Sequence, residues 1–422
     1  MKNPVPSELL ITGLGVTSAI GQGKRAFVDA LLQGQQVFGV MQRPCRQKGT
    51  TFLGAEIPSL FLPDRLSKRL LRTASFSGQV ALATLHEAWD EAQLDAVDAD
   101  RIGLVIGGSN IGQRELIQTY ESYTERVSYL RPTYGISFMD SDLCGLCTEQ
   151  FGIRGLAYTV GGASASGHVA IIQAAQAVLT GQVDVCIAMG ALMDISYLEC
   201  QALRALGAMG TDRYANEPAR ACRPFDKDRD GFIYGEACGA VVIERASTAI
   251  ERGTSPYAVI AGWAIGMDGN RHPNPSYEGE VRVIERALEA ASLSAQEVDY
   301  INPHGTGSMI GDEVELKALR DCQLSHAYIN ATKSITGHGL SAAGTVEVIA
   351  TLLQMQAARL HPSMNLEEPL DPSFNWVLSQ PIKHTIEHAL NMSTGFGGIN
   401  SAICLKRERT LSVTKPKEDD NG

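Results

Sequence analysis

The sequence lacks the features of a membrane-anchored, exported or nucleic-acid-binding protein. No apolar run is long enough to span a bilayer, and residues 1–13 show no apolar stretch after a basic one, so we expect neither an anchor nor a signal peptide. The formal net charge is −11, which opposes unspecific binding to nucleic acid or to an anionic membrane. The nine cysteines are scattered through apolar segments, as is typical of reduced thiols, and we expect a cytoplasmic protein.

Two ligand motifs are present only in part. The turn Gly108–Gly112 is rich in glycine but has neither the dinucleotide fingerprint nor the P-loop lysine, so we predict no nucleotide site. The loop Arg223–Gly231 starts with the aspartate spacing of a calcium loop, yet no glutamate follows at the twelfth position. We therefore predict no metal site.

The sequence does contain a repeated α/β rhythm. Among its 422 residues, short apolar strands, glycine turns and long helices alternate, which predicts α/β layers with helices on the sheet faces. We divide the chain into an N-terminal half, residues 1–250, and a C-terminal half, residues 251–408, and expect the charged tail 409–422 to be disordered. In this scheme Leu9–Val16 is a buried strand, and Met392–Asn400 is a glycine-rich loop before a last strand, Ser401–Leu405.

One stretch of small residues, 161–167, joins a strand to a helix. The helix, Val169–Leu179, is apolar on nearly every side and is expected to be buried. A sharp turn at its start places Ser164 above free N–H groups at the positive end of the helix. The turn nearly matches the Gly-x-Ser-x-Gly motif of serine hydrolases, but its last position is Ser166, and no acidic partner for a triad can be singled out.

Two histidines occur in matched settings in the second half. His304 and His338 each follow a strand in a glycine-rich turn, and Lys333 lies just upstream of His338. Phe396 stands between two glycines on a loop. Since reactive side chains gather at the ends of strands in both halves, we predict a site between the halves.

Together these motifs resemble those of the β-ketoacyl-ACP synthases, over almost the whole chain. The motifs are Asn302-Pro-His304-Gly-Thr306, Thr332-Lys333-Ser-x-Thr-Gly-His338 with Ala342-Ala-Gly344, Arg223-Pro-Phe-Asp-x-x-Arg-Asp-Gly231 and Gly395-Phe396-Gly-Gly-x-Asn400. The resemblance implies a thiolase-like, five-layered αβαβα fold made of two similar halves, in a homodimer. It also implies site roles: His304, His338 and the structural Lys333 belong to the catalytic group, and Phe396 is the gating phenylalanine. Thr306 and Ser308 contact the pantetheine arm, and Gly395 is a further substrate-binding residue.

The sequence departs from this family at Ser164, where the family has a cysteine nucleophile. A thiol has a pKa of ~8.5, whereas a hydroxyl starts nearer the ~15.7 of water. The gap of roughly 7 units corresponds to about 10 kcal/mol, and a helix N-terminus supplies at most ~2 kcal/mol. Ser164 is therefore expected to be a poor nucleophile.

The resemblance leaves the decarboxylating half of the chemistry intact. Two neutral histidines can still hold the enolate formed when malonyl-ACP loses carbon dioxide, so we expect acetyl-ACP as the product. This pattern is similar to the decarboxylating synthase homologues of polyketide β-branching cassettes. It implies an acyl carrier protein as partner, whose phosphopantetheine makes a cofactor of the chain's own unnecessary, and a hydroxymethylglutaryl-CoA-synthase-like enzyme downstream.

Three alternatives stay open at this point. Ser164 could carry an acyl ester in a slow condensing enzyme or acyltransferase. The chain could be a non-catalytic partner of an active synthase, of the chain-length-factor type, although such subunits often lose the histidines. A serine hydrolase is the third alternative.

Overall fold

The computed structural model describes residues 8–408, in which most strands join one twelve-stranded sheet. Its spatial order is β14-β12-β11-β16-β17-β10-β1-β9-β7-β5-β6, with β2 paired to β1. The strands of this sheet are β1 (Leu9–Ser18), β2 (Gly21–Gln22), β5 (Ile102–Gly107), β6 (Ala157–Val160), β7 (Val185–Gly190), β9 (Ala237–Arg245), β10 (Ala258–Met267), β11 (Tyr300–Asn302), β12 (Tyr328–Ile329), β14 (Asn375–Trp376), β16 (His388–Gly395) and β17 (Ile399–Arg407). Two small sheets contain β3 (Gly39–Val40), β4 (Leu53–Ala55) and β8 (Tyr234–Gly235), and β13 (Arg359–Leu360) and β15 (Ile382–Lys383).

The helices form the other layers of the molecule. They are α1 (Lys24–Leu32), α2 (Lys68–Leu71), α3 (Phe76–Glu91), α4 (Gln113–Tyr123), α5 (Tyr134–Ser137), α6 (Ser141–Phe151), α7 (Ser166–Leu179), α8 (Tyr197–Ala205), α9 (Ala246–Arg252), α10 (Tyr277–Ala291), α11 (Gly311–Asp321), α12 (Lys333–Thr336) and α13 (Ala343–Ala357). Within residues 8–408, none of the helices combines the length and the apolar character needed to cross a bilayer.

The sheet consists of two halves with the same topology. The first contains five strands in the spatial order β6-β5-β7-β9-β1, and the second contains five in the order β12-β11-β16-β17-β10. In each set of five, the third strand in sequence lies at one end and the first at the other, and β14 extends the second half beyond β12. In each half the first three strands in this order are parallel and the remaining pairs are antiparallel. Each half also carries a bulge at the same place, before Gly13 in β1 and before Gly262 in β10. The predicted α/β fold of two similar halves is confirmed.

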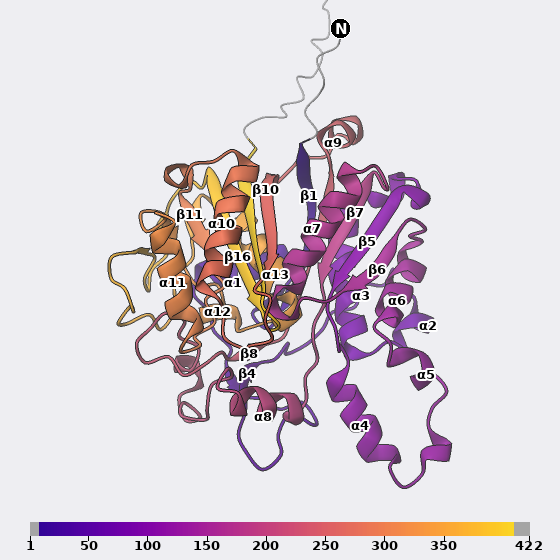
Figure 1. Cartoon of the computed structure of the whole chain (residues 1–422). Coiled ribbons are helices and arrows are strands. Elements are labelled where there is room, and N and C mark those ends of the chain that lie inside the picture. The colour runs from indigo at the N-terminus through magenta and orange to yellow at the C-terminus, as the bar shows by residue number, and fades with distance from the viewer. Residues whose placement is uncertain (1–7, 409–422) are drawn as a thin grey trace, which may run out of the picture.

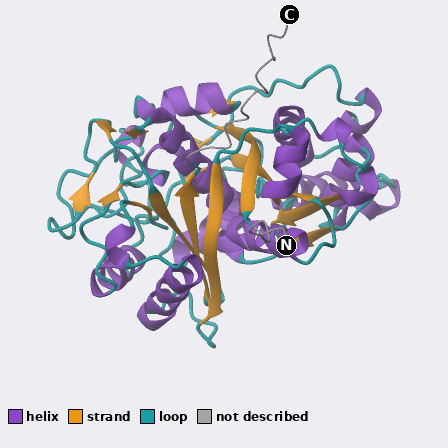
Figure 2. Ribbon diagram, turned by 90° about the horizontal axis from the view of Figure 1, so that it is seen from above, coloured by secondary structure: helices purple, strands orange, loops and turns teal. Residues whose placement is uncertain are grey.

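The layers follow from which helices pack on which strands. Helices α3 and α6 cover the outer face of the first half, α10 and α11 cover that of the second, and α7 and α13 lie between the halves (Figure 1). Figure 2 shows helices on either side of the long central strands. The central helices are buried almost all round, because they have protein on every side. This arrangement is the five-layered αβαβα sandwich. The boundary predicted at residue 250 falls inside α9, between β9 and β10, and remains a prediction.

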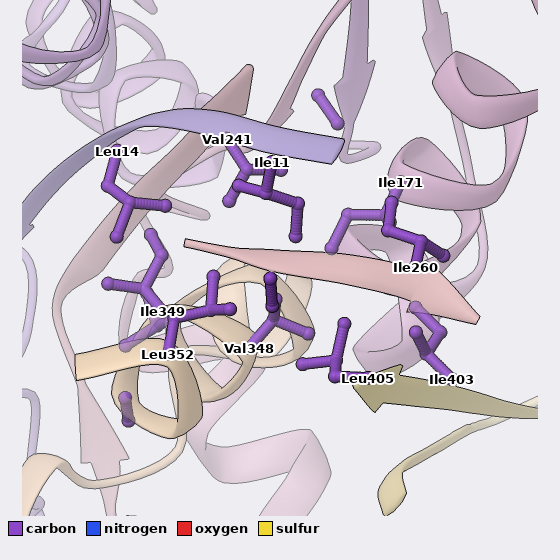
Figure 3. Packing of buried hydrophobic residues seen from close by; sticks show 14 of the residues in the cluster. Ile11, Leu14, Ile171, Val241, Ile260, Val348, Ile349, Leu352, Ile403 and Leu405 are labelled. Atoms are coloured by element: carbon purple, nitrogen blue, oxygen red, sulfur yellow. The ribbon is translucent and has the colours of Figure 1, made fainter. Parts of the chain in front are cut away.

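One hydrophobic cluster joins the two halves. It takes side chains from the first half, from the second half and from both central helices (Figure 3). Labelled members are Ile11, Leu14, Val241, Ile260, Ile403 and Leu405 on strands, Ile171 on α7, and Val348, Ile349 and Leu352 on α13. Because the halves share this core, neither half has a complete hydrophobic interior by itself.

The structure corrects one boundary near the site. Met392–Asn400 was expected to be a loop, but β16 continues to Gly395 and β17 begins at Ile399. The backbone of this stretch pairs across the hairpin, with Gly395 opposite Ile399. The real turn is therefore only residues 396–398, where Gly397 and Gly398 adopt positive φ angles of 92° and 83°. The predicted disordered tail, 409–422, lies outside the described residues.

Candidate active site

Ser164 lies in a 3-10 turn, Ala163–Ala165, which leads directly into α7. Ala163 has a φ of 46°, a left-handed conformation that costs a non-glycine residue free energy. The Ser166 hydroxyl stabilises this turn, because it donates to the Ala163 carbonyl at 2.7 Å and accepts from the Gly162 N–H at 2.9 Å. The residue that breaks the hydrolase motif thus fixes the backbone of Ser164.

Ser164 is hydrogen-bonded to one of the two predicted histidines. Its Oγ lies 2.9 Å from Nε2 of His338. Nδ1 of His338 is buried and has no hydrogen-bond partner within residues 8–408. An N–H buried without an acceptor is costly, so the proton is expected on Nε2, from where it is donated to Ser164. Burial, and then the charge of Lys333, lower the pKa of His338 well below its ordinary value, so the ring is neutral.

His304 stands beside His338 at the end of β11. The two imidazole centroids are 5.5 Å apart and their planes meet at 82°. Glu315 of α11 fixes the backbone here, because Oε1 accepts the His304 N–H at 2.6 Å and Oε2 accepts the Gly305 N–H at 2.8 Å. Burial, followed by Lys333 and His338, lowers the pKa of His304 well below its ordinary value. Two neutral imidazoles therefore face one small region.

Lys333 supports these histidines from behind. Its ammonium group donates to the backbone carbonyl of His304 and to the carboxylate of Glu347 on α13. Both side chains of this ion pair are almost completely buried. Burial raises the pKa of Glu347 to about 7, although Lys333 acts in the opposite direction. Since Lys333 is not among the residues that line the cavity, it positions His304 and does not reach substrate.

The turn after His304 is held by a second buried carboxylate, Asp312. Its oxygens accept the N–H groups of Phe225 at 2.6 Å, Gly307 at 3.0 Å and Thr306 at 3.2 Å. Burial raises the pKa of Asp312 to about 6. Thr306 and Ser308 consequently line the cavity from a fixed loop, as expected of residues that contact an extended arm.

Gly395 and Phe396 form the opposite wall. A side chain at Gly395 would lie 2.4 Å from the carbonyl oxygen of Gly162, so only glycine lets β16 approach the start of α7 this closely. Phe396 is 42% exposed at the hairpin tip and also lines the cavity. The gating role expected of Phe396 stays a prediction.

A cavity of about 260 Å³ brings these side chains together. It is lined by seven of the eight predicted site residues, Ser164, His304, Thr306, Ser308, His338, Gly395 and Phe396. Its apolar part is formed by Met193, Leu203, Ala208, Phe232 and Leu340. The sequence interpretation missed Glu280, Asp312 and Glu315, which also line it. One signal was available: Glu280 lies on the same helix face as the apolar Val283, Ile284 and Ala287.

Comparison with known proteins agrees with this architecture. Residues 7–249 match the beta-ketoacyl synthase N-terminal domain, and residues 257–367 match its C-terminal domain. The chain belongs to the beta-ketoacyl synthase family. The family assignment predicted from the motifs is confirmed.

Individual relatives cover nearly the whole chain. The polyketide biosynthesis malonyl-ACP decarboxylase PksF of Bacillus subtilis is 64% identical over 399 residues, which are 94% of this chain and 96% of that protein. The chloroplastic 3-oxoacyl-[acyl-carrier-protein] synthase I of Arabidopsis thaliana is 31% identical over 94% of this chain and 86% of its own length. Among solved structures, the ishigamide ketosynthase/chain length factor superposes with a TM-score of 0.87 at 24% identity, over 96% of this chain and 100% of that chain, which bears on the fold alone.

Proposed function

We propose that this β-ketoacyl synthase homologue decarboxylates malonyl-ACP to acetyl-ACP for polyketide β-branching. The observation that carries the proposal is the contact of Ser164 Oγ with Nε2 of His338 at 2.9 Å, in a ring whose Nδ1 has no partner within residues 8–408. The name of the 64% identical relative, a malonyl-ACP decarboxylase, supports the same activity.

This geometry leaves Ser164 without an activating base. In a Ser-His-Asp triad, a carboxylate accepts the Nδ1 proton of the histidine and stabilises the imidazolium that forms. Among the residues that the structure describes, no carboxylate accepts from Nδ1 of His338, and the nearby Lys333 cation disfavours an imidazolium further. Acyl transfer through Ser164, by condensation or by hydrolysis, would therefore start from an unassisted hydroxyl.

The same arrangement fits decarboxylation. The malonyl thioester would enter past Phe396 with its arm along Thr306 and Ser308, all of which line the cavity. Its carbonyl oxygen would lie between the N–H groups of His304 and His338, where it would replace Ser164 as the acceptor of the His338 N–H. As carbon dioxide leaves, the electrons of the broken carbon–carbon bond move into the thioester as an enolate, whose oxygen these two donors stabilise. A proton on C2 then completes acetyl-ACP.

The partners belong to this proposal. The substrate arrives on an acyl carrier protein, whose phosphopantetheine makes a resident cofactor unnecessary, and a hydroxymethylglutaryl-CoA-synthase-like enzyme uses the product. We place the reaction in the cytoplasm, in keeping with nine cysteines that are all free thiols.

We also propose a homodimer. The segment 113–139, which includes α4 and α5, extends away from the body in Figure 1 and exposes many large apolar side chains. They are Leu116, Tyr120, Val127, Tyr129, Ile136, Phe138 and Met139. Strand β6, at the edge of the large sheet, leaves its outer side available for another strand. Light scattering of the protein and of an Ile136→Asp, Phe138→Asp variant tests this: a dimer that dissociates agrees, and a wild-type monomer refutes it.

The decisive experiment follows the intact masses of malonyl-ACP and of the protein. We expect the carrier to lose one carbon dioxide while the protein gains no mass. His304→Ala should slow this at least about 100-fold, the usual size of an electrostatic contribution of this kind. His86→Ala, on the outer helix α3, is the matched control and should leave the rate unchanged. A stable acyl mass on the protein would instead indicate acyl transfer through Ser164, and no change in either species would indicate a non-catalytic subunit.

A further inference from the structure

Three carboxyl side chains are buried in the wall of the cavity. Glu280 comes from the first turn of α10, and Asp312 and Glu315 come from α11. Each is no more than 3% exposed, and each lines the same cavity as Ser164 and the two histidines. The mechanism above explains two of them as supports of the His304 turn and leaves Glu280 without a role.

Asp312 and Glu315 are held as acceptors. Asp312 accepts three backbone N–H groups and Glu315 accepts two, at distances of 2.6 to 3.2 Å. Hydrogen bonds of this kind favour the ionised carboxylate. Burial raises the pKa of Asp312 to about 6 and that of Glu315 to about 7, and the backbone donors act against this rise. Asp312 and Glu315 therefore ionise in preference to a buried carboxyl group that has no such donors.

Glu280 has none of these donors. Its Oε2 is buried without a hydrogen-bond partner within residues 8–408, and no described cation forms an ion pair with it. Arg229 pairs with Glu313 instead, and Lys333 pairs with Glu347. Burial raises the pKa of Glu280 well above its usual range, and the charges of Glu315, Asp268 and Asp312 add to this. At neutral pH Glu280 is thus a carboxylic acid that lines the cavity with its proton uncommitted.

A decarboxylase needs such a proton, whereas a condensing enzyme does not. In condensation C2 of the enolate attacks an acyl group, but here C2 must be protonated. His304 and His338 use their N–H groups for the enolate oxygen. The Ser164 hydroxyl is a far weaker acid than a carboxyl group, by roughly 11 pKa units on model values.

We propose that Glu280 is the acid that protonates C2 of the enolate, an inference that rests on the proposed decarboxylation. The O–H bond of Glu280 breaks as the C2–H bond forms, and the electron pair of the enolate double bond makes the new bond while the thioester carbonyl is restored. Glu280 is left as a carboxylate and regains its proton from water that enters the cavity. No oxidant, reductant or further co-reactant takes part.

The test separates proton delivery from bond cleavage. Malonyl-ACP is incubated in the presence of ¹³C-labelled carbon dioxide, and two products are measured by mass: acetyl-ACP, and malonyl-ACP that has recaptured the label. An enolate that waits for a proton recombines with carbon dioxide more often. For Glu280→Gln we expect acetyl-ACP formation to fall about 100-fold, the size of a general-acid contribution, and the ratio of recaptured label to acetyl-ACP to rise by a similar factor.

Two further variants complete the design. Glu278→Gln makes the same substitution at an exposed position on the same helix and should match the wild type. Glu280→Asp keeps an acid and should restore part of the acetyl-ACP rate with a low recapture ratio. The inference is overturned if the ratio of recaptured label to acetyl-ACP is the same in Glu280→Gln as in the wild type, whether the turnover of the variant is normal or reduced. It is also overturned if this ratio rises in Ser164→Ala and not in Glu280→Gln. If the wild type releases no carbon dioxide from malonyl-ACP, the proposed function itself fails.

Discussion

The two halves of the molecule start their buried helices in the same way but use them differently. Before α7 and before α13 the chain forms a 3-10 turn, Ala163–Ala165 and Leu340–Ala342. The first residue of each turn is left-handed, with φ of 46° at Ala163 and 50° at Leu340. The second residue of each is a serine, Ser164 and Ser341. The repeated topology therefore provides two equivalent helix starts beside one cavity.

Their hydroxyl groups have different partners. Ser341 is 2% exposed and donates to the carbonyl of Ala191 at 2.8 Å, so its hydroxyl is part of the packing. Ser164 has its hydroxyl against Nε2 of His338. The fold therefore places a serine at the start of a buried helix twice, once in each half. Ser164 belongs to the site because its hydroxyl, unlike that of Ser341, contacts a histidine of the second half.

The largest expected effect comes from breaking the contact that brings both helix starts together. A side chain at Gly167 would lie 2.6 Å from the backbone nitrogen of Thr345, and one at Gly344 would lie 2.9 Å from that of His168. Gly167→Val should lower the free energy of unfolding by about 3 kcal/mol, because neither backbone can retreat. Urea denaturation measures this. Gly145→Val, at an exposed site of α6 with nothing near its Cβ, is the control, and an equal loss in both variants would contradict the explanation.

The next largest effect is a new ability to accept an acyl group, which we expect at the start of only one of the two helices. Ser164→Cys places a thiol at the positive end of α7, where its pKa should fall below the ~8.5 of a free cysteine. We expect this variant to take up an acyl group from an acyl thioester, seen as a stable mass increase. Ser341→Cys should not, since the side chain at that position, although it also lines the cavity, is directed at the carbonyl of Ala191 and has no histidine beside it. Equal acylation of both thiols would show that the two positions are equivalent after all.

Removing each hydroxyl separately should affect the decarboxylation rate in one variant and the free energy of unfolding in the other. Ser164→Ala loses a hydroxyl that contacts His338 and should change decarboxylation by less than about 10-fold, with little effect on unfolding, because the histidines keep their places. Ser341→Ala leaves the carbonyl of Ala191 without its donor and should cost about 1 kcal/mol of stability at unchanged turnover. Both quantities can be measured on the same preparations, and the reverse pattern would refute the assignment.

The smallest effect concerns the charge that keeps the histidines neutral. Lys333 lowers the pKa of His304 and His338, so Lys333→Met should raise both toward the ordinary value. Nitrogen-15 NMR of labelled histidine follows each ring through a pH titration. His361 is the internal control. Burial, and not Lys333, lowers its pKa to about 4, so this pKa should not change in the variant. If all three shift together, the cause is loosened packing.

Local patterns were enough to predict most of the site. The small residues of the Ser164 turn and the glycine-rich turns at His304 and His338 mark strand ends, and strand ends of this sheet meet at the cavity. The hairpin before β17 was misjudged for a physical reason. Gly397 and Gly398 do form a turn, but whether Met392 is loop or strand depends on its pairing with Ala402, which local composition does not contain.

The sequence by itself determined the fold class and the family, since these depend on residue types and on periodicities within short segments. The resemblance to that family, and not the pattern alone, implies that Ser164 stands where a cysteine nucleophile is usual. Only the tertiary structure decided how the remaining groups act. Lys333 is five residues from His338, yet its ammonium reaches the carbonyl of His304, 29 residues away. In the sequence, Glu280 is one of several charged residues of an amphipathic helix. In the structure it is buried close to two other carboxyl groups. Proton affinities and hydrogen-bond partners depend on burial and on neighbours distant in sequence, and these exist only once the helices and the sheet have packed.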